Sequence, residues 1–327
     1  MKAMILAAGF GTRLFPLTID RTKPAIPFLG KPLVGYVAEY VAKYGFDEIV
    51  VNLHHQPDSV KQALGDGEEF GVTITYTHEV PEILGTSGAL DNARKHLESG
   101  TFIVVNGKIV TDIDIAAALE THKRLGAIAT MVLRENEKFE KFTEVFVQNE
   151  EVKGFASGFP IENPKSHLSI PLMFTGIQIL EPEVFEYIPR NVYSDIVPSF
   201  YLPAIADGRK IAAHVCGNRW FELSTIPRYL DISLEMMNAD KVFKGANCKI
   251  ASNASVANSV IWDDVTIGEN TTINRAIIAD GVTIPEGAHF EDVAIVTAEM
   301  LKHCDDIPEK ALNGEYVGAN YVVSLIQ

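Results

Sequence analysis

A glycine-containing turn near the N-terminus is the part of this chain whose residue types best suit chemistry. The apolar run at 3–7 leads into GFGTRL, where Gly9 and Gly11 allow the backbone to approach a ligand closely. Consecutive backbone N–H groups in such a turn can surround phosphate oxygens. Arg13 and Lys23 follow and would add two positive charges. A GxG turn alone is weak evidence, but this combination predicts a site for a chain of phosphoryl groups.

The elements that must position this turn alternate between strands and helices through roughly the first 240 residues. Short apolar runs predict buried strands at 3–7, 48–53, 101–107 and 127–133. Apolar residues at helical spacing predict helices between them, for example at 33–45 and 114–125. This order predicts a mostly parallel α/β sheet with helices on both faces. Ligands of such sheets bind beyond the carboxyl ends of the strands, where Gly9–Arg13, 52–55 and Asn106–Lys108 fall.

Two further stretches depart from this alternation. Residues 143–180 alternate short strands, which predicts an antiparallel extension of the sheet. After Gly245 the chain repeats every 17 residues, and apolar columns align across three rows, for example Ile250, Ile267 and Ile284. Such a repeat is typical of stacked parallel coils and resembles the hexapeptide-repeat left-handed β-helix, with the edge of an ordinary β-sandwich as the alternative.

The amino-acid composition of the chain argues against some classes of binding partner. The chain has 28 Lys and Arg against 43 Asp and Glu, a net charge of −15, which argues against binding to nucleic acid or to an anionic membrane. Its apolar runs are far shorter than the ~20 residues of a membrane-spanning helix. The N-terminus runs straight into the glycine turn without a signal peptide, and the three cysteines lack metal-type spacing. We therefore expect a cytoplasmic protein with reduced thiols.

The string KAMILAAGFGTRLFPLTIDRTKPAIPFLGKPL, at 2–33, resembles the sugar-phosphate nucleotidyltransferases, especially members like the mannose-1-phosphate guanylyltransferases. The resemblance implies a Rossmann-like nucleotidyltransferase domain at 1–240, a β-helix at 245–295, and a cap or subunit interface at 296–327. It also implies transfer of a nucleoside monophosphate from an NTP to a sugar 1-phosphate, giving an NDP-sugar and pyrophosphate. Because a short β-helix has exposed ends, a homo-oligomer is expected.

The resemblance also assigns roles to individual residues. Arg13 and Lys23 are the expected catalytic cations, and the expected nucleotide-binding residues are Ala7, Ala8, Gly9, Gly11, Thr12, Gly85, Thr86, Gly88 and Asn106. Of these, Gly85–Gly88 in ILGTSGAL match a segment whose backbone reads the base. Gly176 in FTGI and Glu162 are expected at the sugar. His54 and His55 in NLHH match a variant of two family branches, or are simply the polar end of a strand.

Three departures from the family pattern concern the metal and the sugar. Family members hold Mg²⁺ with two aspartates, but Lys108 stands at the first of these positions, and an ammonium has no acceptor with which to ligate a metal. Glu222 stands at the second. Where the family has its Glu-Lys-Pro motif for the sugar, GFASGFP at 154–160 has Ser157 and Gly158, with Glu162 and Lys165 nearby.

These departures leave two interpretations open. In one, the protein is an active transferase, in which Asp112 and Asp114 supply oxygen ligands or Lys108 replaces part of the charge of the metal. In the other, it is a catalytically silent relative that binds a nucleotide or nucleotide sugar and regulates a partner. A β-helix acyltransferase is a third class, disfavoured because the repeat has only three rows and a lone histidine, His289.

Overall fold

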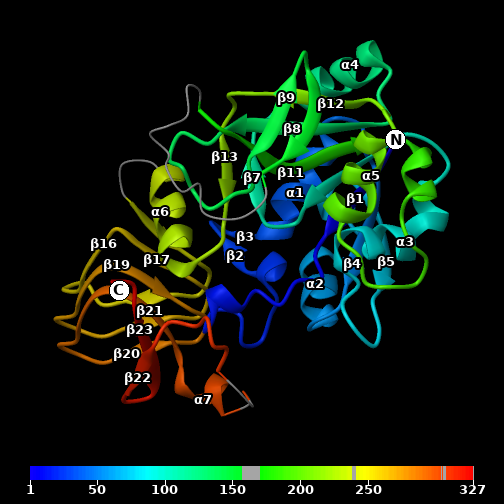
Figure 1. Ribbon diagram of the computed structural model, residues 1–327. Coiled ribbons are helices and arrows are strands. Elements are labelled where there is room, and N and C mark those ends of the chain that lie inside the picture. The colour runs from blue at the N-terminus through cyan, green and yellow to red at the C-terminus, as the bar shows by residue number, and fades with distance from the viewer. Residues whose placement is uncertain (157–169, 238–240, 303, 305–306, 327) are drawn as a thin grey trace. The chain divides into compact units, whose positions relative to one another are not determined.

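The computed structural model describes residues 1–156, 170–237, 241–302, 304 and 307–326 (Figure 1). The chain forms two compact units. The first comprises Met1–Ala8, Val34–Pro57 and Leu64–Trp220, and the second comprises Gly9–Leu33, Asp58–Ala63 and Phe221–Gln327. The domain boundaries predicted at 240, 245 and 295 stay a prediction.

A mixed sheet forms the centre of the first unit. Its strands are β1 (Lys2–Leu6), β4 (Glu48–Leu53), β5 (Thr73–His78), β6 (Phe102–Asn106), β8 (Ala129–Glu135), β9 (Val145–Gln148), β10 (Glu151–Phe155), β11 (Leu172–Leu180) and β12 (Ile211–Val215). They lie in the order β5-β4-β1-β6-β11-β8-β12-β10-β9. The first four are parallel, β11 is antiparallel to both of its neighbours, and β9 and β10 form an antiparallel pair. This confirms the predicted α/β class.

Register explains why the strand ends meet. Leu6 of β1 is paired with Asn52 of β4 and with Asn106 of β6, so the three strands end at one edge of the sheet. The interior of β1 is 0% exposed at Ala3, Met4 and Ile5, because helices cover both faces of a parallel sheet and such strands are apolar throughout. The polar residues that follow each strand are therefore gathered at one edge.

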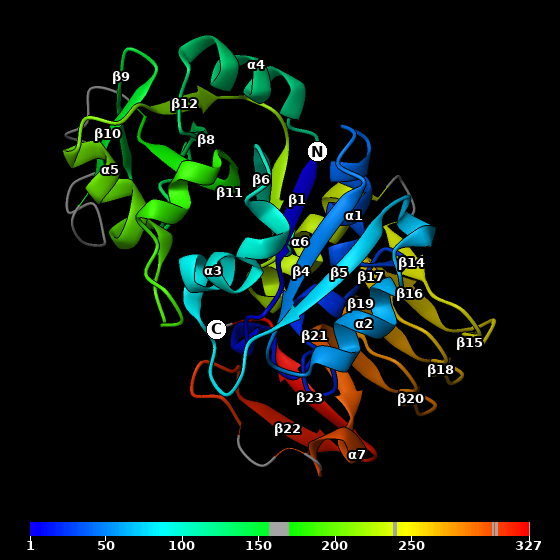
Figure 2. The same ribbon diagram turned by 90° about the vertical axis from the view of Figure 1, so that its right-hand side faces the viewer.

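Helices and short strands complete this unit. The helices that lie within it are α3 (Gly85–Leu97), α4 (Ile115–Leu125) and α5 (Leu202–Ala206), with β7 (Ile109–Thr111) and the helical turns η5 (Pro182–Glu186) and η6 (Val197–Tyr201). Helix α3 contacts β1 and β4 (Figure 2), and its Ala89 and Ala93 are fully buried in the core. Helix α4 begins at the Asp114 cap and ends at Gly126, whose φ of 57° lets the chain turn.

Three elements cross between the units along the chain, namely α1 (Leu33–Ala42), α2 (Pro57–Leu64) and β13 (Trp220–Glu222). The second unit contains the turns η1 (Thr12–Leu14) and η2 (Lys23–Ala25), the hairpin of β2 (Pro27–Phe28) and β3 (Lys31–Pro32), and α6 (Ile226–Met236). Tyr229 of α6 donates a hydrogen bond to the Pro27 carbonyl at 2.6 Å and accepts one from the Trp262 indole at 3.1 Å. The helix therefore links the hairpin to the repeat region.

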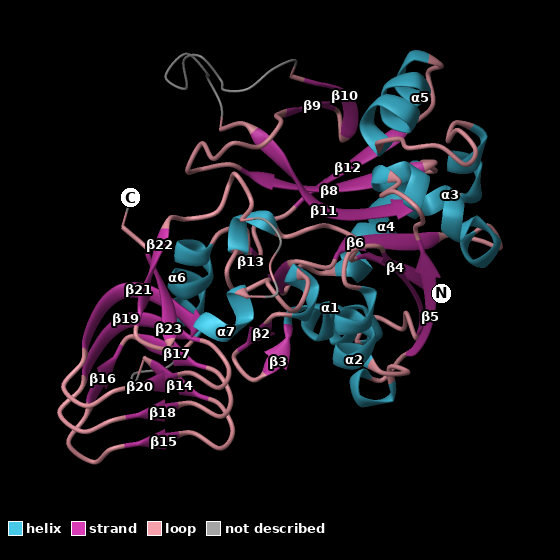
Figure 3. Ribbon diagram, turned by 90° about the horizontal axis from the view of Figure 1, so that it is seen from below, coloured by secondary structure: helices cyan, strands magenta, loops and turns pink. Residues whose placement is uncertain are grey.

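The repeat forms stacked parallel coils (Figure 3). Their strands are β14 (Val242–Lys244), β15 (Lys249–Ile250), β16 (Ser255–Ala257), β17 (Ser259–Ile261), β18 (Thr266–Ile267), β19 (Thr272–Ile278), β20 (Thr283–Ile284) and β21 (His289–Thr297). Ile250 pairs with Ile267, and Ile267 pairs with Ile284, which is the register the 17-residue rows predict. The buried columns pack inside the coils.

The corners of the coils follow the same period. Asn258, Arg275 and Asp292 occur 17 residues apart, with φ of 47°, 53° and 50°. Asparagine and aspartate tolerate this left-handed conformation better than most residues, because their short side chains bond locally. Arg275 is the exception in this column, and its guanidinium is bonded to the Asp292 carboxylate at 2.7 Å.

The C-terminal segment adds to the last coil. After the short helix α7 (Ala298–Leu301), the strands β22 (Gly314–Val317) and β23 (Asn320–Ser324) form a hairpin, and β23 pairs antiparallel with β21. The parallel stack therefore ends in an antiparallel hairpin. None of the helices in the described part of the chain combines the length and apolarity that a membrane crossing requires.

Candidate nucleotide site

The glycine turn is fixed in the second unit by the residues behind it. Gly11 has φ of 69°, and a Cβ there would lie 3.1 Å from the Lys23 Cβ and 3.2 Å from the Lys23 backbone nitrogen. Leu14 is fully buried and its N–H bonds to the Gly11 carbonyl at 2.9 Å, which holds the turn. Gly11 is therefore a requirement of the fold.

Gly9 and Arg13 have a different setting. A Cβ on Gly9 would meet nothing within 4 Å, so the fold itself does not require glycine there. Arg13 is exposed, and its side chain forms no ion pair with the described part of the chain. Lys23, the other predicted cation, is only 7% exposed and packs behind the turn. The turn therefore offers open space at Gly9 and an available cation at Arg13.

In the first unit, a buried carboxylate ties the strand ends together. Asn52 accepts a hydrogen bond from the Ala7 N–H at 2.8 Å and donates one to Glu79 Oε1 at 2.6 Å. The other oxygen of Glu79 accepts from the Leu84 N–H at 2.7 Å, and Glu79 is 0% exposed. The segment that enters the glycine turn and the loop that begins α3 are therefore held by one side-chain network. Sequence reasoning missed Glu79.

The NLHH motif at 52–55 belongs to the same hydrogen-bond network. His54 Nδ1 lies 2.8 Å from the Glu79 carbonyl oxygen, in addition to the bond between Asn52 and the Glu79 carboxylate. Burial lowers the pKa of His55, and the positive form of the neighbouring His54 lowers it further. Asn52 and His54 thus hold the loop after β5, which favours the interpretation of this motif as the structured polar end of a strand.

Strand β6 ends at a close approach to β1. The Gly107 N–H donates to the Leu6 carbonyl at 2.9 Å, and a Cβ on Gly107 would lie 2.8 Å from that oxygen. Gly176 has φ of 81°, and a Cβ there would overlap the Asn106 side-chain amide. The structure therefore brings Asn106, predicted at the nucleotide, into contact with Gly176, predicted at the sugar.

The backbone N–H groups at the start of α3 donate hydrogen bonds to other residues of the protein. The N–H groups of Ser87 and Gly88 donate to the Ser194 carbonyl at 3.0 and 3.1 Å, and the Thr86 N–H donates to the Asp195 carboxylate at 3.2 Å. A Cβ on Gly85 would lie 2.6 Å from the Ser194 oxygen, so this glycine is explained by close packing. The backbone donors expected to read a base at 86–88 are thus already in use.

Comparison with known proteins decides the family. The sequence profile of the nucleotidyl transferase family matches residues 2–239, and a GlmU-like C-terminal hexapeptide profile matches residues 238–292. The chain belongs to the nucleotidyl transferase family. Its hexapeptide coils form the left-handed parallel β-helix that the repeat predicted.

Relatives in this family are about one third identical to the chain over the aligned residues. UTP--glucose-1-phosphate uridylyltransferase of Synechocystis is 30% identical over 82% of this chain and 72% of its own length. Mannose-1-phosphate guanylyltransferase 1 of Arabidopsis thaliana is 32% identical over 82% and 73%. N-acetylmuramate alpha-1-phosphate uridylyltransferase of Neisseria meningitidis is 33% identical over 70% and 95%.

A solved structure supports the fold of this nucleotidyl transferase. A Bacillus anthracis protein assigned as a glucose-1-phosphate thymidylyltransferase superimposes with a TM-score of 0.60, covering 73% of this chain and 97% of that one, at 21% identity. At this identity the likeness shows the fold alone.

Several residues near the predicted metal position are poor ligands for Mg²⁺, which requires oxygen donors. Lys108 offers only N–H donors, and Asp112 and Asp114, the carboxylates proposed as substitutes, each accept hydrogen bonds within the protein. Asp112 accepts two hydrogen bonds from Arg219, one from the backbone N–H and one from the side-chain Nε, each at 2.8 Å. Asp114 caps α4 by accepting the Ala116 N–H at 2.9 Å. In the part of the chain that the structure describes, no three His, Cys, Asp or Glu side chains gather as metal ligands.

The two remaining predictions concern Glu222 at the metal and Glu162 at the sugar. Glu222, the remaining metal candidate, is 7% exposed and belongs to the second unit. Glu162, predicted at the sugar, lies outside the described residues, as do Ser157, Gly158 and Lys165. The assignment of ligand contacts to individual residues therefore stays a prediction.

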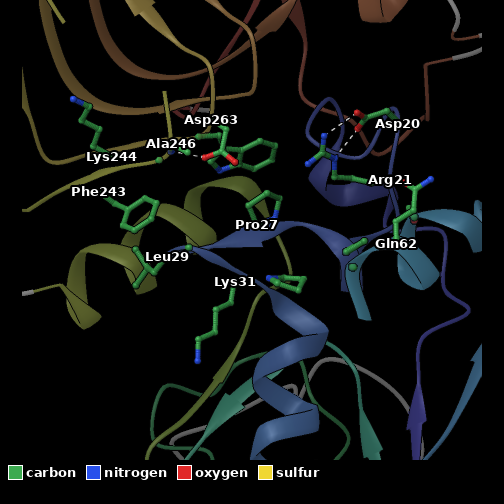
Figure 4. Close-up of a pocket in the computed structure, with 17 residues that line it drawn as sticks. Asp20, Arg21, Pro27, Leu29, Lys31, Gln62, Phe243, Lys244, Ala246 and Asp263 are labelled. Atoms are coloured by element: carbon green, nitrogen blue, oxygen red, sulfur yellow. Dashed lines mark hydrogen bonds and ion pairs between the residues drawn. The ribbon is translucent and has the colours of Figure 1, made fainter. Parts of the chain in front are cut away.

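A pocket of about 760 Å³ in the second unit is separate from the glycine turn (Figure 4). Its lining includes Phe243, Trp262 and Arg21, and it contains no residue of Gly9–Arg13. The Arg21 guanidinium is bonded to Asp20 and to Asp280, each at 2.8 Å, and lies 5.4 Å from the centre of the Trp262 ring. Burial lowers the pKa of Arg21, but its two carboxylate partners outweigh this and raise it. The Arg21 charge in this pocket is therefore already paired with two carboxylates, while Lys31 and Lys244 also line it.

The two glycines of the turn give a paired prediction. Gly9→Ala is expected to leave thermal stability unchanged and to weaken nucleotide binding about tenfold or more, because its Cβ enters the space open to ligand. Gly11→Ala is expected to lower the free energy of unfolding by about 1–2 kcal/mol, the cost of a left-handed residue with a side chain. Thermal unfolding and calorimetric titration with nucleotide measure both. Wild-type affinity in a folded Gly9→Ala protein would overturn the assignment of the turn.

Proposed function

We propose that this nucleotidyl transferase joins an NTP to a sugar 1-phosphate, forming an NDP-sugar and pyrophosphate. The observation that carries the proposal is the turn after β1, where Gly9 leaves open space and Arg13 presents an exposed cation, in a chain of this family. The named activities of its relatives are uridylyl and guanylyl transfer to sugar 1-phosphates, and they support the same reaction type.

The protein would contribute to this reaction mainly by positioning the substrates and by neutralising charge. An oxygen of the sugar 1-phosphate attacks the α-phosphorus and forms a new P–O bond, while the bond from that phosphorus to the β-phosphate oxygen breaks and pyrophosphate leaves. The departing pyrophosphate gains negative charge, which the exposed Arg13 would neutralise. Backbone N–H groups of the turn would orient the phosphates, and such orientation accounts for much of the rate gain in reactions between two bound substrates.

The metal, the assembly and the location have less support. The resemblance to metal-dependent transferases implies Mg²⁺, an ion that the Glu222 carboxylate could ligate and the Lys108 ammonium could not. Self-association and a cytoplasmic location remain predictions from the sequence. For the substrates, the names of the relatives favour GTP with mannose 1-phosphate, or UTP with a glucose-type or amino-sugar 1-phosphate.

The test is a grid of pyrophosphate-release assays on the purified chain. Five nucleotides (ATP, CTP, GTP, UTP and dTTP) are each combined with mannose, glucose and N-acetylmuramate 1-phosphates, with MgCl₂ and with EDTA, and products are identified by mass spectrometry. At least one pair should yield pyrophosphate and the matching NDP-sugar in equal amounts. Tight NDP-sugar binding without turnover for any pair would instead identify a catalytically silent relative.

A further inference from the structure

The end of β6 places a lysine beside the strand that enters the glycine turn. Leu6 is in register with Asn106, and the bond of 2.9 Å from Gly107 N–H to the Leu6 carbonyl holds the two chains together one residue before Lys108. A Cβ on Gly107 would lie 2.8 Å from that carbonyl oxygen, so the close approach of the two chains requires glycine. Lys108 follows this contact directly, and Leu6 on the other chain leads through Ala7 and Ala8 into Gly9.

The carboxylates that follow this strand end already accept hydrogen bonds within the protein. Both oxygens of Asp112 accept bonds from Arg219, and Asp114 is the N-cap of α4. At the adjoining strand end, Asn52 Oδ1 accepts the Ala7 N–H. A divalent cation bound through Asp112 or Asn52 would compete with these bonds, and the positive charge of Lys108 would repel it.

A phosphoryl group has the opposite preference. An ammonium supplies three rotatable donors and a compact positive charge, which suits phosphate oxygens. The chain carries a net charge of −15, which repels an anionic ligand, so binding of one depends on a local cation. The local chemistry at the β6 end therefore favours phosphate and disfavours a metal.

We infer that Lys108 replaces a divalent cation as the positive charge that binds the phosphates of the nucleotide at the end of β6. This rests on the proposed function, since it assumes that a nucleotide binds at these strand ends. The consequence is specific: nucleotide and NDP-sugar affinity does not require Mg²⁺. An aspartate at this position would restore that requirement.

The experiment compares binding with and without metal in the full chain. Isothermal titration uses the NDP-sugar that binds most tightly among GDP-mannose, UDP-glucose and dTDP-glucose, in EDTA and in excess MgCl₂. An NDP-sugar is a better probe than an NTP because Mg²⁺ complexes a triphosphate in solution. The variants are Lys108→Asp, Lys108→Met as an uncharged side chain of similar length, and Lys108→Arg as the charge-preserving control. Thermal unfolding verifies that each variant is folded.

The wild type and Lys108→Arg are expected to bind with dissociation constants that agree within about threefold between EDTA and MgCl₂. Lys108→Met should bind about 10- to 100-fold more weakly in both buffers, the effect of losing one charged hydrogen bond. Lys108→Asp should lose binding in EDTA and regain at least about tenfold with MgCl₂. The variants therefore separate loss of charge from loss of side-chain volume.

The outcomes that overturn the inference differ from those that overturn the proposed function. A wild-type affinity that falls more than tenfold in EDTA means that a metal binds after all and that the inference fails alone. Equal affinities for wild type and a folded Lys108→Met protein also defeat it, because the charge then does nothing. If no NDP-sugar and no NTP binds in either buffer, the proposed function fails and the inference falls with it.

Discussion

Replacing Arg13 with alanine is expected to lower kcat/KM for nucleotide transfer about 100- to 1,000-fold, the usual loss when one group that stabilises developing charge is removed. Stability should not change, because Arg13 is exposed and forms no ion pair with the described residues. Most of the loss is expected in kcat, since charge on the departing pyrophosphate develops in the transition state. Steady-state kinetics with the best substrate pair measure it.

A second exposed arginine provides the matched control. Arg124 pairs with Glu150 at 2.6 Å, and both side chains are more than half exposed. Exposed ion pairs of this kind contribute little, so Arg124→Ala should retain near wild-type kinetics and stability. If both arginine variants were equally active, Arg13 would have no role at the phosphates.

The isosteric change Glu79→Gln is expected to destabilise the protein by about 2–3 kcal/mol, because it replaces one buried acceptor oxygen with an NH₂ donor. Both oxygens of Glu79 accept bonds from N–H donors, on Asn52 and on Leu84, whereas a glutamine side chain has one oxygen and one NH₂ group. Flipping the Asn52 amide does not help, because its oxygen already accepts the Ala7 N–H. Every arrangement leaves one buried donor facing another donor.

The control for this change lies in the same loop. Glu82 is exposed, so Glu82→Gln should leave the free energy of unfolding within about 0.5 kcal/mol of wild type. Denaturant unfolding compares the two variants. Glu79→Gln should also weaken nucleotide binding, because Ala7 and Leu84 are bonded to the ends of this network. Equal stability of both variants would show that the buried carboxylate is not paired as described.

The fold was predictable where one local pattern repeats. The 17-residue rows set the register of the β-helix, because each coil buries the same columns as its neighbour, as Ile250, Ile267 and Ile284 do. The parallel strands were predictable from their apolar runs, and so was the meeting of their polar ends at one edge.

The detail of the site was not predictable, because it depends on partners distant in sequence. Asp112 looked like a possible metal ligand until Arg219, which is 107 residues away, was seen to occupy it. Thr86–Gly88 looked like base-reading donors, but Ser194 and Asp195 accept their N–H groups. Glu79 directly follows strand β5, but nothing in the local sequence distinguishes a buried carboxylate from a solvated one.

Hydrogen exchange with and without bound NDP-sugar tests most directly the claim that the nucleotide binds at these strand ends. Mass spectrometry of peptides covers both units, and the pocket lined by Phe243 and Trp262 serves as the internal comparison. The account predicts slower exchange in peptides spanning 7–14 and 105–110. Protection confined to peptides around 243–263, with none at the glycine turn, would contradict it.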